Sequence, residues 1–159
     1  MGRTASLTIS AGDFDDPRVL ALLRLHLAGM HANSPPGHVF ALDLSGLRQP
    51  SISFFTAWSG ENLAGMGALK DLGDGTGELK SMRTDPRYLR QGIGAMLLDY
   101  LLAVARARGY RRVSLETGSG EAFEAAIAMY RKRGFVDGVA FGDYLKSPFN
   151  QFLHLQLVA

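Results

Sequence analysis

The chain has 159 residues, 47% of them hydrophobic and 20% charged, which is typical of one globular domain, and we take residues 1–159 as a single domain. No stretch approaches the roughly 18 apolar residues of a membrane span, and residues 1–10 lack a secretory pattern, so we expect a cytoplasmic protein with no membrane partner. The absence of cysteine excludes disulfides, thiolate metal sites and cysteine nucleophiles. The net charge of +2 gives no reason to expect a nucleic acid partner, and we expect no metal.

The first half of the chain predicts a strand, one or two helices and then three antiparallel strands. Leu7–Ser10 is a short strand, and Asp16-Pro17 begins a helix whose apolar residues recur at helical spacing as far as Met30. The helix ends before Pro35-Pro36-Gly37, and Val39–Leu47 is ambiguous, with a short helix as one reading. The three strands that follow, joined by turns, are Ile52–Trp58, Leu63–Leu69 and Gly77–Thr84.

The second half of the chain alternates helices and strands. Helical spacing runs from Ile93 to Val104, and Gly109 is a plausible stop. The elements predicted after it are a strand at Arg112–Thr117, a helix at Glu121–Lys132, and strands at Phe135–Phe141 and Gln151–Leu157. The order predicts an α/β (α+β) fold with a mixed, mostly antiparallel central sheet of about six to seven strands, flanked by about four helices.

The segment from Glu78 to Leu98 carries the strongest chemical signal. A strand runs into a loop with two glycines, Gly92 and Gly94, and these lead into an amphipathic helix. Glycines let a ligand approach the backbone, and the first turn of a helix offers free N–H groups and a partial positive charge. Arg87 and Arg90 add positive charge nearby. The segment therefore predicts an anion site that suits a pyrophosphate.

Two common nucleotide-binding motifs do not fit this segment. A Walker loop needs Gly-Lys-Ser/Thr after the glycines, whereas Ala95-Met96 follows Gly94 here. A dinucleotide fingerprint needs a third glycine, and position 97 is leucine; it also belongs after a first parallel strand, not after a run of hairpins.

With these motifs in place, the chain resembles the GNAT superfamily of N-acetyltransferases. The family's phosphate loop is similar to Gly92-Ile93-Gly94 with the apolar residues after it, and a later family motif is similar to Met129–Phe135, in which Tyr130 is followed by Gly134-Phe135. The sequence departs from the family pattern at Leu89, where Arg or Gln is usual, and at Phe123, where Asn is common. The resemblance implies a GNAT-like acyl-CoA N-acyltransferase fold.

The resemblance also implies a bound acyl-CoA, expected to be acetyl-CoA, between two strands that splay apart. Backbone groups near Met82 would meet the pantetheine arm, and the glycine loop would hold the pyrophosphate. The residues expected at the cofactor are Met82, Arg83, Thr84, Arg90, Gln91, Gly92, Ile93, Gly94 and Ala95.

The family reaction implies three candidate catalytic residues. Tyr130 would protonate the departing thiolate, although its helical face also suits a core residue. Glu78 and Glu116, on the two strands that border the expected cleft, are the candidate bases that take the proton of the amine, and Glu78 is slightly favoured because its strand carries the main motif. We expect Glu78 to share a strand face with Lys80, Met82 and Thr84.

The acceptor side is less defined by the sequence. His31 and Ser34, in a polar stretch beside two prolines, and Trp58 are candidate substrate residues; Phe141 and Tyr144 are further candidates for the pocket wall. His26 lies on an apolar stripe and is expected to be a satisfied core histidine.

The sequence thus predicts transfer of an acetyl group to a primary amine of a small or amino-acid-like acceptor. The alternatives are an acetyltransferase of protein N-termini or lysines, and a non-catalytic acyl-CoA-binding regulatory module. By analogy with such folds, a homodimer is possible.

Overall fold

The computed structural model describes residues 6–157. The elements in chain order are β1 (Leu7–Ala11), α1 (Pro17–Asn33), α2 (Leu44–Leu47), β2 (Ile52–Ser59), β3 (Asn62–Asp71), β4 (Thr76–Thr84), a short 3-10 turn (Pro86–Tyr88), α3 (Ile93–Ala107), β5 (Arg112–Thr117), α4 (Glu121–Lys132), β6 (Val136–Asp137) and β7 (Gln151–Gln156). The strands form one mixed sheet in the order β1-β2-β3-β4-β5-β7-β6. The predicted fold class is confirmed.

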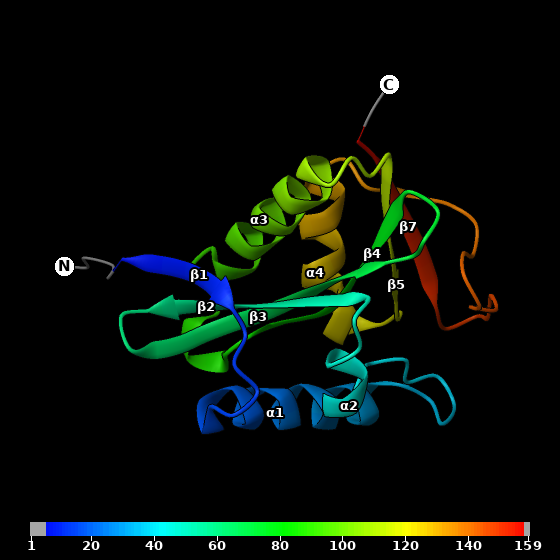
Figure 1. Cartoon of the computed structure of the whole chain (residues 1–159). Helices are drawn as coiled ribbons and strands as arrows, with labels where there is room; N and C mark the ends of the chain where they lie inside the picture. The colour runs from blue at the N-terminus through cyan, green and yellow to red at the C-terminus, as the bar shows by residue number, and fades with distance from the viewer. Residues whose placement is uncertain (1–5, 158–159) are drawn as a thin grey trace.

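The helices cover both faces of the sheet. In Figure 1, α1 and α2 lie against one face and α3 lies against the other. On the first face, Val19, Leu22 and Leu23 of α1 pack with Phe54 and Met66. On the second face, leucines of α3 pack with β3, β4 and β5, and this cluster continues into α4 through Tyr130. Burial of these apolar stripes is the main source of stability for elements of this length.

Local signals set the helix boundaries. The side chain of Asp16 accepts a hydrogen bond from the Arg18 backbone N–H, and Pro17 occupies the first turn of α1. Asp43 caps the short helix α2 in the same way, through the backbone N–H of Gly46. Both are arrangements in which a side-chain oxygen satisfies a backbone donor that the helix leaves free.

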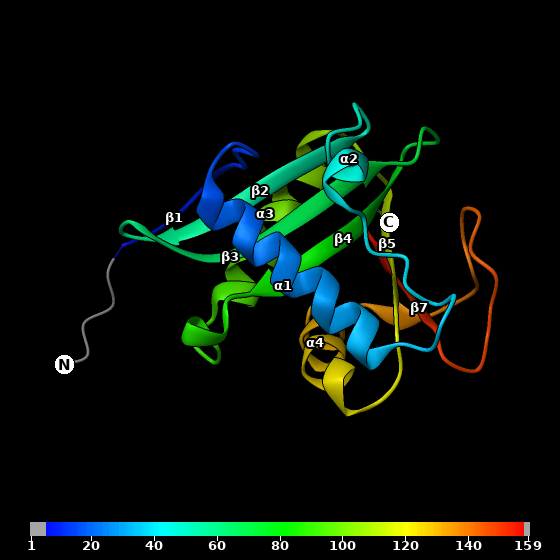
Figure 2. The same cartoon turned by 90° about the horizontal axis from the view of Figure 1, so that it is seen from below.

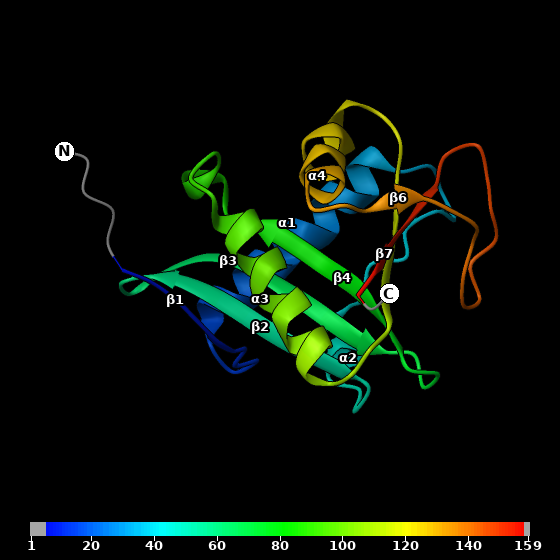
Figure 3. The same cartoon turned by 90° about the horizontal axis from the view of Figure 1, so that it is seen from above.

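The sheet divides between β4 and β5. These two strands are parallel and pair only over Thr76–Glu78 with Arg112–Ser114, whereas the other neighbouring strands pair antiparallel. Beyond Glu78 and Ser114 the two strands diverge, and Figures 2 and 3 show α1 and α4 near this opening on either side of β4. The remaining length of β4, from Leu79 to Thr84, has no strand on its β5 side.

A β-bulge at Ser81 changes which side chains of β4 share a face. The register shifts between Met66 and Ala68 of β3, so that Ser81 and Met82 together face Gly67, and Ser81 has φ of 57°. An extra residue in one strand moves every later side chain to the opposite face.

The expectation that Glu78, Lys80, Met82 and Thr84 share one face is therefore wrong. Lys80 contacts Tyr144 on the α1 side of the sheet, whereas Met82 packs with the α3 cluster. After the bulge it is Arg83, not Met82, that returns to the α1 side, where it contacts His26. The bulge thus places one more positive side chain on the α1 face than strict alternation predicts.

The strand expected over Phe135–Phe141 is much shorter, since β6 contains only Val136 and Asp137. Gly138 makes one more backbone hydrogen bond, to Phe152 O at 3.0 Å, and the chain then leaves the sheet. The ring of His154 lies where a side chain at position 138 would be, with Cδ2 2.3 Å from an ideal Cβ. The segment between β6 and β7 instead forms a loop that carries Tyr144 toward β4.

No helix within residues 6–157 is long and apolar enough to cross a membrane.

Candidate active site

A cavity of about 690 Å³ opens where β4 and β5 diverge. Its walls come from α1, the second half of β4, the loop before α3, the end of β5 and one face of α4. The cavity therefore reaches from the N-terminus of α3 on one side of the sheet to α1 on the other.

The start of α3 forms the first end of the cavity. Gly92 has φ of 82°, a left-handed conformation that favours glycine, and it begins α3 with no side-chain cap. The backbone N–H groups of the first helical turn, from Ile93 to Ala95, are therefore free for a ligand, and the helix dipole favours an anion there. Gly94 and Ala95 line the cavity, and so does Arg90. These features fit a phosphate group.

The open edge of β4 forms the middle of the cavity. Residues Leu79 to Thr84 line it and have no partner strand on that side. An extended ligand can hydrogen-bond to such an edge as an added strand would. Ser81 lies there too, and its Oγ is buried without a hydrogen-bond partner among the described residues. A buried hydroxyl usually has a partner, so this one suits a ligand with polar groups along its length.

A buried polar network stands on the α1 side of β4. The Tyr144 hydroxyl donates to Glu78 Oε2, and Lys80 Nζ lies 2.6 Å from the Tyr144 oxygen and 3.2 Å from Glu78 Oε2. The Glu78 and Lys80 side chains are only 3% and 9% exposed, so their charges are compensated inside the protein. Burial and the nearby Glu78 carboxylate raise the pKa of Tyr144, which therefore stays a neutral donor.

Glu116, on β5, faces the cavity directly. Burial is the main cause that raises the pKa of Glu116 to about 7, and the negative charge of Glu78 adds to it, while Lys80 and a hydrogen bond with Asn150 act in the opposite direction. A carboxyl group with a pKa near neutrality is suited to accept a proton at physiological pH.

Tyr130, on α4, also lines the cavity. Its side chain is 6% exposed, and its ring packs edge-on against Phe135 at 5.7 Å between centroids. Burial raises the pKa of Tyr130, so its hydroxyl remains protonated and can donate a proton or a hydrogen bond. The core and catalytic interpretations of this residue are thus compatible.

His26 and Arg83 occupy the α1 end of the cavity. Arg83 Nε donates to His26 Nδ1 at 3.0 Å, and Arg83 Nη2 lies 3.5 Å from the His26 carbonyl oxygen. Burial, with the Arg83 charge beside it, lowers the pKa of His26 to about 4, so the ring is neutral and accepts this hydrogen bond. His26 is thus the satisfied buried histidine that the sequence suggests, and it also lines the cavity.

The cavity brings together most of the predicted site. It is lined by Tyr130 and Glu116 of the catalytic set, and by every predicted cofactor residue except Gln91. Gln91 is exposed, and its side chain donates to the Arg87 carbonyl oxygen at 3.4 Å. Glu78 lies behind the cavity wall, in the network with Tyr144.

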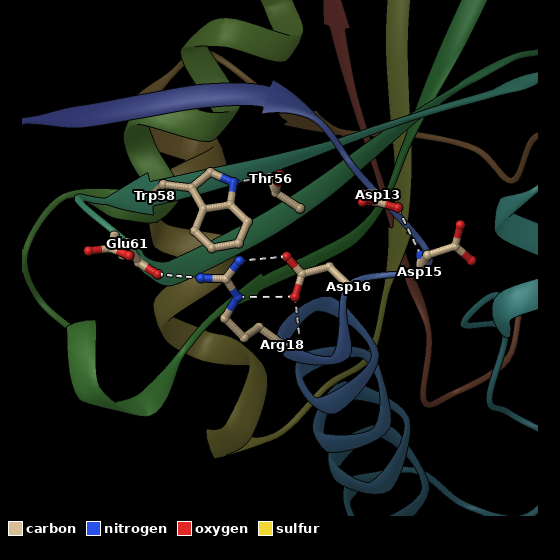
Figure 4. A network of polar contacts seen from close by, with 7 residues as sticks. All are labelled: Asp13, Asp15, Asp16, Arg18, Thr56, Trp58 and Glu61. Atoms are coloured by element: carbon tan, nitrogen blue, oxygen red, sulfur yellow. Dashed lines mark hydrogen bonds and ion pairs between the residues drawn. The ribbon is translucent and has the colours of Figure 1, made fainter.

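The three predicted substrate residues lie outside the cavity wall. His31 is exposed on α1, and Ser34 follows α1 as its C-cap. Trp58 lies on β2, where the Arg18 guanidinium stacks over its ring at 4.6 Å and its Nε1 donates to Thr56 at 2.9 Å (Figure 4). Arg18 is in turn fixed by Asp16. The structure therefore does not bring Trp58 to the acceptor side.

Three residues of the site carried little sequence signal. Ser81 enters it through the bulge, Lys80 through its contact with Tyr144, and Asn150 through its position next to β7. Of the further candidates for the pocket wall, neither Phe141 nor Tyr144 lines the cavity, and Tyr144 reaches the site only through its contacts with Glu78 and Lys80. Within residues 6–157, no cluster of His, Asp and Glu side chains is arranged to hold a metal ion.

A pair of parallel strands that diverge and a free helix N-terminus in one cavity are the features that the resemblance to N-acyltransferases implies for acyl-CoA binding. Comparison with known sequences gives the particular family. The sequence model of the family described as "Acetyltransferase (GNAT) family" matches residues 19–135. The chain therefore belongs to the GNAT family and is an N-acetyltransferase.

Relatives support this assignment over most of the chain. An uncharacterized N-acetyltransferase of Escherichia coli, YedL, is 47% identical over 150 residues, which cover 94% of each chain. The IAA acetyltransferase of Azospirillum brasilense is 38% identical over 117 residues, covering 73% of this chain and 75% of the relative.

Solved structures share the fold. A putative acyl-CoA N-acyltransferase from Klebsiella pneumoniae is 30% identical and has a TM-score of 0.80, with 95% of this chain and 97% of that chain covered. A Bacillus subtilis acetyltransferase solved in complex with CoA is 20% identical, with a TM-score of 0.72 over 96% of this chain and 100% of that chain.

Proposed function

We propose that the protein transfers an acetyl group from acetyl-CoA to a primary amine of a small or amino-acid-like acceptor. The observation that carries this proposal is that one cavity holds the free N-terminus of α3, the open edge of β4 and the two groups that the proton transfers need, Glu116 and Tyr130.

The binding groups for acetyl-CoA follow the length of the cavity. The amides of the first α3 turn, after Gly92, suit the pyrophosphate, and Arg90 adds a positive charge beside them. The backbone of β4 between Leu79 and Thr84 suits the amides of the pantetheine arm. In this arrangement we expect the thioester between β4 and β5, where the cavity passes through the sheet.

Glu116 is the favoured base. In the reaction, the amine nitrogen forms a bond to the acetyl carbon, the carbon–sulfur bond breaks, and the nitrogen loses a proton. Glu116 lines the cavity, and its pKa of about 7 allows it to accept that proton, directly or through a water. Glu78 is less suited to this step because it is buried behind the wall and accepts from Tyr144.

Donors are available for the charges that develop in the reaction. The thioester oxygen gains negative charge, which a backbone N–H at the bulge or the free Ser81 hydroxyl can stabilise. The sulfur leaves as a thiolate and takes a proton, for which the neutral Tyr130 hydroxyl, in the cavity wall, is the candidate.

The α1 side of the cavity supports a small acceptor. The loop between β6 and β7 packs Tyr144 edge-on against Phe40 at 5.3 Å between centroids, and Phe40 lines the cavity. Tyr144 thus packs behind Phe40 at the α1 end of the cavity, and we take the two rings as a cover on the acceptor side. A protein acceptor needs an open groove there, and the cover therefore favours a small amine.

The proposal is tested by a screen for CoA thiol release from acetyl-CoA with amines, amino acids, polyamines and N-terminal peptides. The chain has no cysteine, so any new thiol is CoA itself. We expect release with at least one class of small amine, and none with a Gly94→Glu variant. Release with peptides alone would favour a protein acceptor, and CoA binding without release by any amine would indicate a regulatory module.

A further inference from the structure

The Arg83 guanidinium on the α1 side of the cavity has no acidic partner. The five ion pairs within residues 6–157 join other residues: Arg18–Asp16, Lys80–Glu78, Arg87–Asp85, Arg131–Asp137 and Arg133–Asp99. The hydrogen bonds of Arg83 both go to His26, which is neutral. Partial burial lowers the pKa of Arg83, and no carboxylate offsets this effect. A half-buried cation without a counter-charge is costly unless a ligand supplies one.

The arrangement around Arg83 holds the guanidinium toward α1 rather than toward the phosphate end. Nε is committed to the His26 ring, and Nη2 lies over Gly29, where an ideal Cβ would be only 2.9 Å away. Gly29, His26 and Arg83 all line the cavity. Nη1 makes no hydrogen bond with the described residues, so part of the donor fork is open to a ligand.

Among the described residues, Arg83 is the cation on the acceptor side of the cavity that has no acidic partner. Lys80 is bound to Glu78 and Tyr144. Arg90 lies in the loop just before α3, beside the phosphate end. His26 carries no charge at neutral pH.

We propose that the acceptor amine carries a carboxylate and that Arg83 binds it, so that the substrates are free amino acids or closely related amino-carboxylates. Glu116 and Arg83 then interact with the two ends of the same molecule. The amine lies beside Glu116, and the carboxylate binds the guanidinium of Arg83. A guanidinium matches a carboxylate in charge and in planar geometry. This inference rests on the proposed function, and it moves Arg83 from the predicted cofactor set to the acceptor site.

The test uses acceptors with and without the anionic group, compared per concentration of neutral amine because loss of the carboxylate also lowers the pKa of the α-amino group. Amino acids are compared with their C-terminal amides in the CoA-release assay, for wild type, Arg83→Met and Arg83→Lys, with Arg24→Met as the control. Arg24 is an exposed arginine on the same helix as His26, outside the cavity wall. Thermal unfolding shows that each variant is folded.

We expect wild type to prefer the amino acid over its amide by about 10-fold or more in kcat/KM, because a charge-assisted hydrogen bond is lost with the amide. Arg83→Met should remove that preference through a higher KM for the amino acid, Arg83→Lys should restore part of it, and Arg24→Met should behave as wild type. The dissociation constant for CoA should be the same in all four proteins.

Three results would overturn the proposal in distinguishable ways. Equal or better turnover of the amides by wild type removes the carboxylate preference but leaves the proposed function standing. If Arg83→Met binds CoA more weakly but still prefers amino acids over their amides, Arg83 contacts the cofactor and not the acceptor. Release with no small amine at all ends the proposed function and this inference together.

Discussion

The carboxyl group of Glu116 decides how the activity should depend on pH. Its pKa of about 7 means that the proton-accepting form is lost as pH falls below neutrality. We expect kcat/KM to decline on the acid side with an apparent pKa near 7. Glu116→Gln should lower kcat by about 100-fold or more and remove this limb of the profile, measured by CoA release from pH 5.5 to 9. An unchanged acid limb in the variant would assign the base elsewhere.

The same carboxyl group links pH to stability with a definite sign. Its pKa is higher in the folded protein than the ordinary value of 4.5, so the folded state binds more protons between about pH 4.5 and 7. Stability therefore falls as pH rises through this range. We expect Glu116→Gln to flatten that part of the curve of unfolding free energy against pH, measured by urea unfolding, with Glu121→Gln, an exposed glutamate, as the control.

A substitution at Gly29 should affect the stability of α1 and the recognition of the acceptor in opposite directions. Alanine at this mid-helix position should raise helix stability by roughly 0.5–1 kcal/mol. Its Cβ would lie 2.9 Å from Arg83 Nη2, so the guanidinium must shift. We expect Gly29→Ala to raise the melting temperature and to weaken the preference for amino acids over amides. Ala28→Gly, at an exposed position, supplies the opposite helix effect without the contact.

At the residue scale, the sequence predicted which groups lie at the cavity better than it predicted their orientation. Glu116 and Tyr130 were identified from their elements and the resemblance, and both line the cavity. The preference for Glu78 over Glu116 as base has no support in the geometry, because the contact that buries Glu78 comes from Tyr144, 66 residues further along the chain. A contact over such a distance leaves no local pattern to read.

At the scale of elements, the bulge in β4 sets the two faces of the site. Ser81 holds φ of 57°, which is unfavourable for a residue with a Cβ and worse for a β-branched one. We expect Ser81→Val to destabilise the fold by about 1–3 kcal/mol and to weaken the amino acid preference, since the position of Arg83 depends on the bulge. Ser81→Gly, which tolerates this φ, should keep both properties. Chemical unfolding and paired-acceptor kinetics measure the two effects; equal stability of the variants would contradict the argument.

Hydrophobic alternation alone does not reveal such a bulge. From Leu79 to Thr84 the sequence is compatible with an unbroken strand, and one extra residue moves Met82 and Arg83 to the opposite faces. The helix starts were predictable because Asp16-Pro17 and Gly92 leave explicit signals. The shortness of β6 was not, because no local pattern marks the point after Gly138 at which the chain leaves the sheet.

At the scale of the whole molecule, the two parts of the sheet are joined by few backbone pairs. β4 and β5 share a register of only three residues on each strand. A ligand that hydrogen-bonds along the open edge of β4 should therefore stabilise the entire fold. CoA at 100 times its dissociation constant should add about 2.7 kcal/mol to the unfolding free energy, measured as a rise in melting temperature. Gly94→Glu should show no such rise, and an equal rise in that variant would place CoA elsewhere.

The overall architecture followed from the sequence because the order of elements is so restrictive. Three hairpin strands followed by alternating helices and strands allow few arrangements of a mixed sheet. The order of elements does not predict the length over which β4 and β5 stay paired. That length depends on the packing of α1 and α4 at the opening.

The strand order also has a consequence for synthesis on the ribosome. β7 lies between β5 and β6 although it follows both in the chain. Until residues 151–156 have emerged, β5 has only its short pairing with β4, and β6 has no neighbour at all. The hairpins of β2, β3 and β4 can form while translation continues, but the half of the sheet that carries Glu116 is assembled last. The opening between β4 and β5, with Glu116 at its edge, is therefore completed only after the last strand has been synthesised.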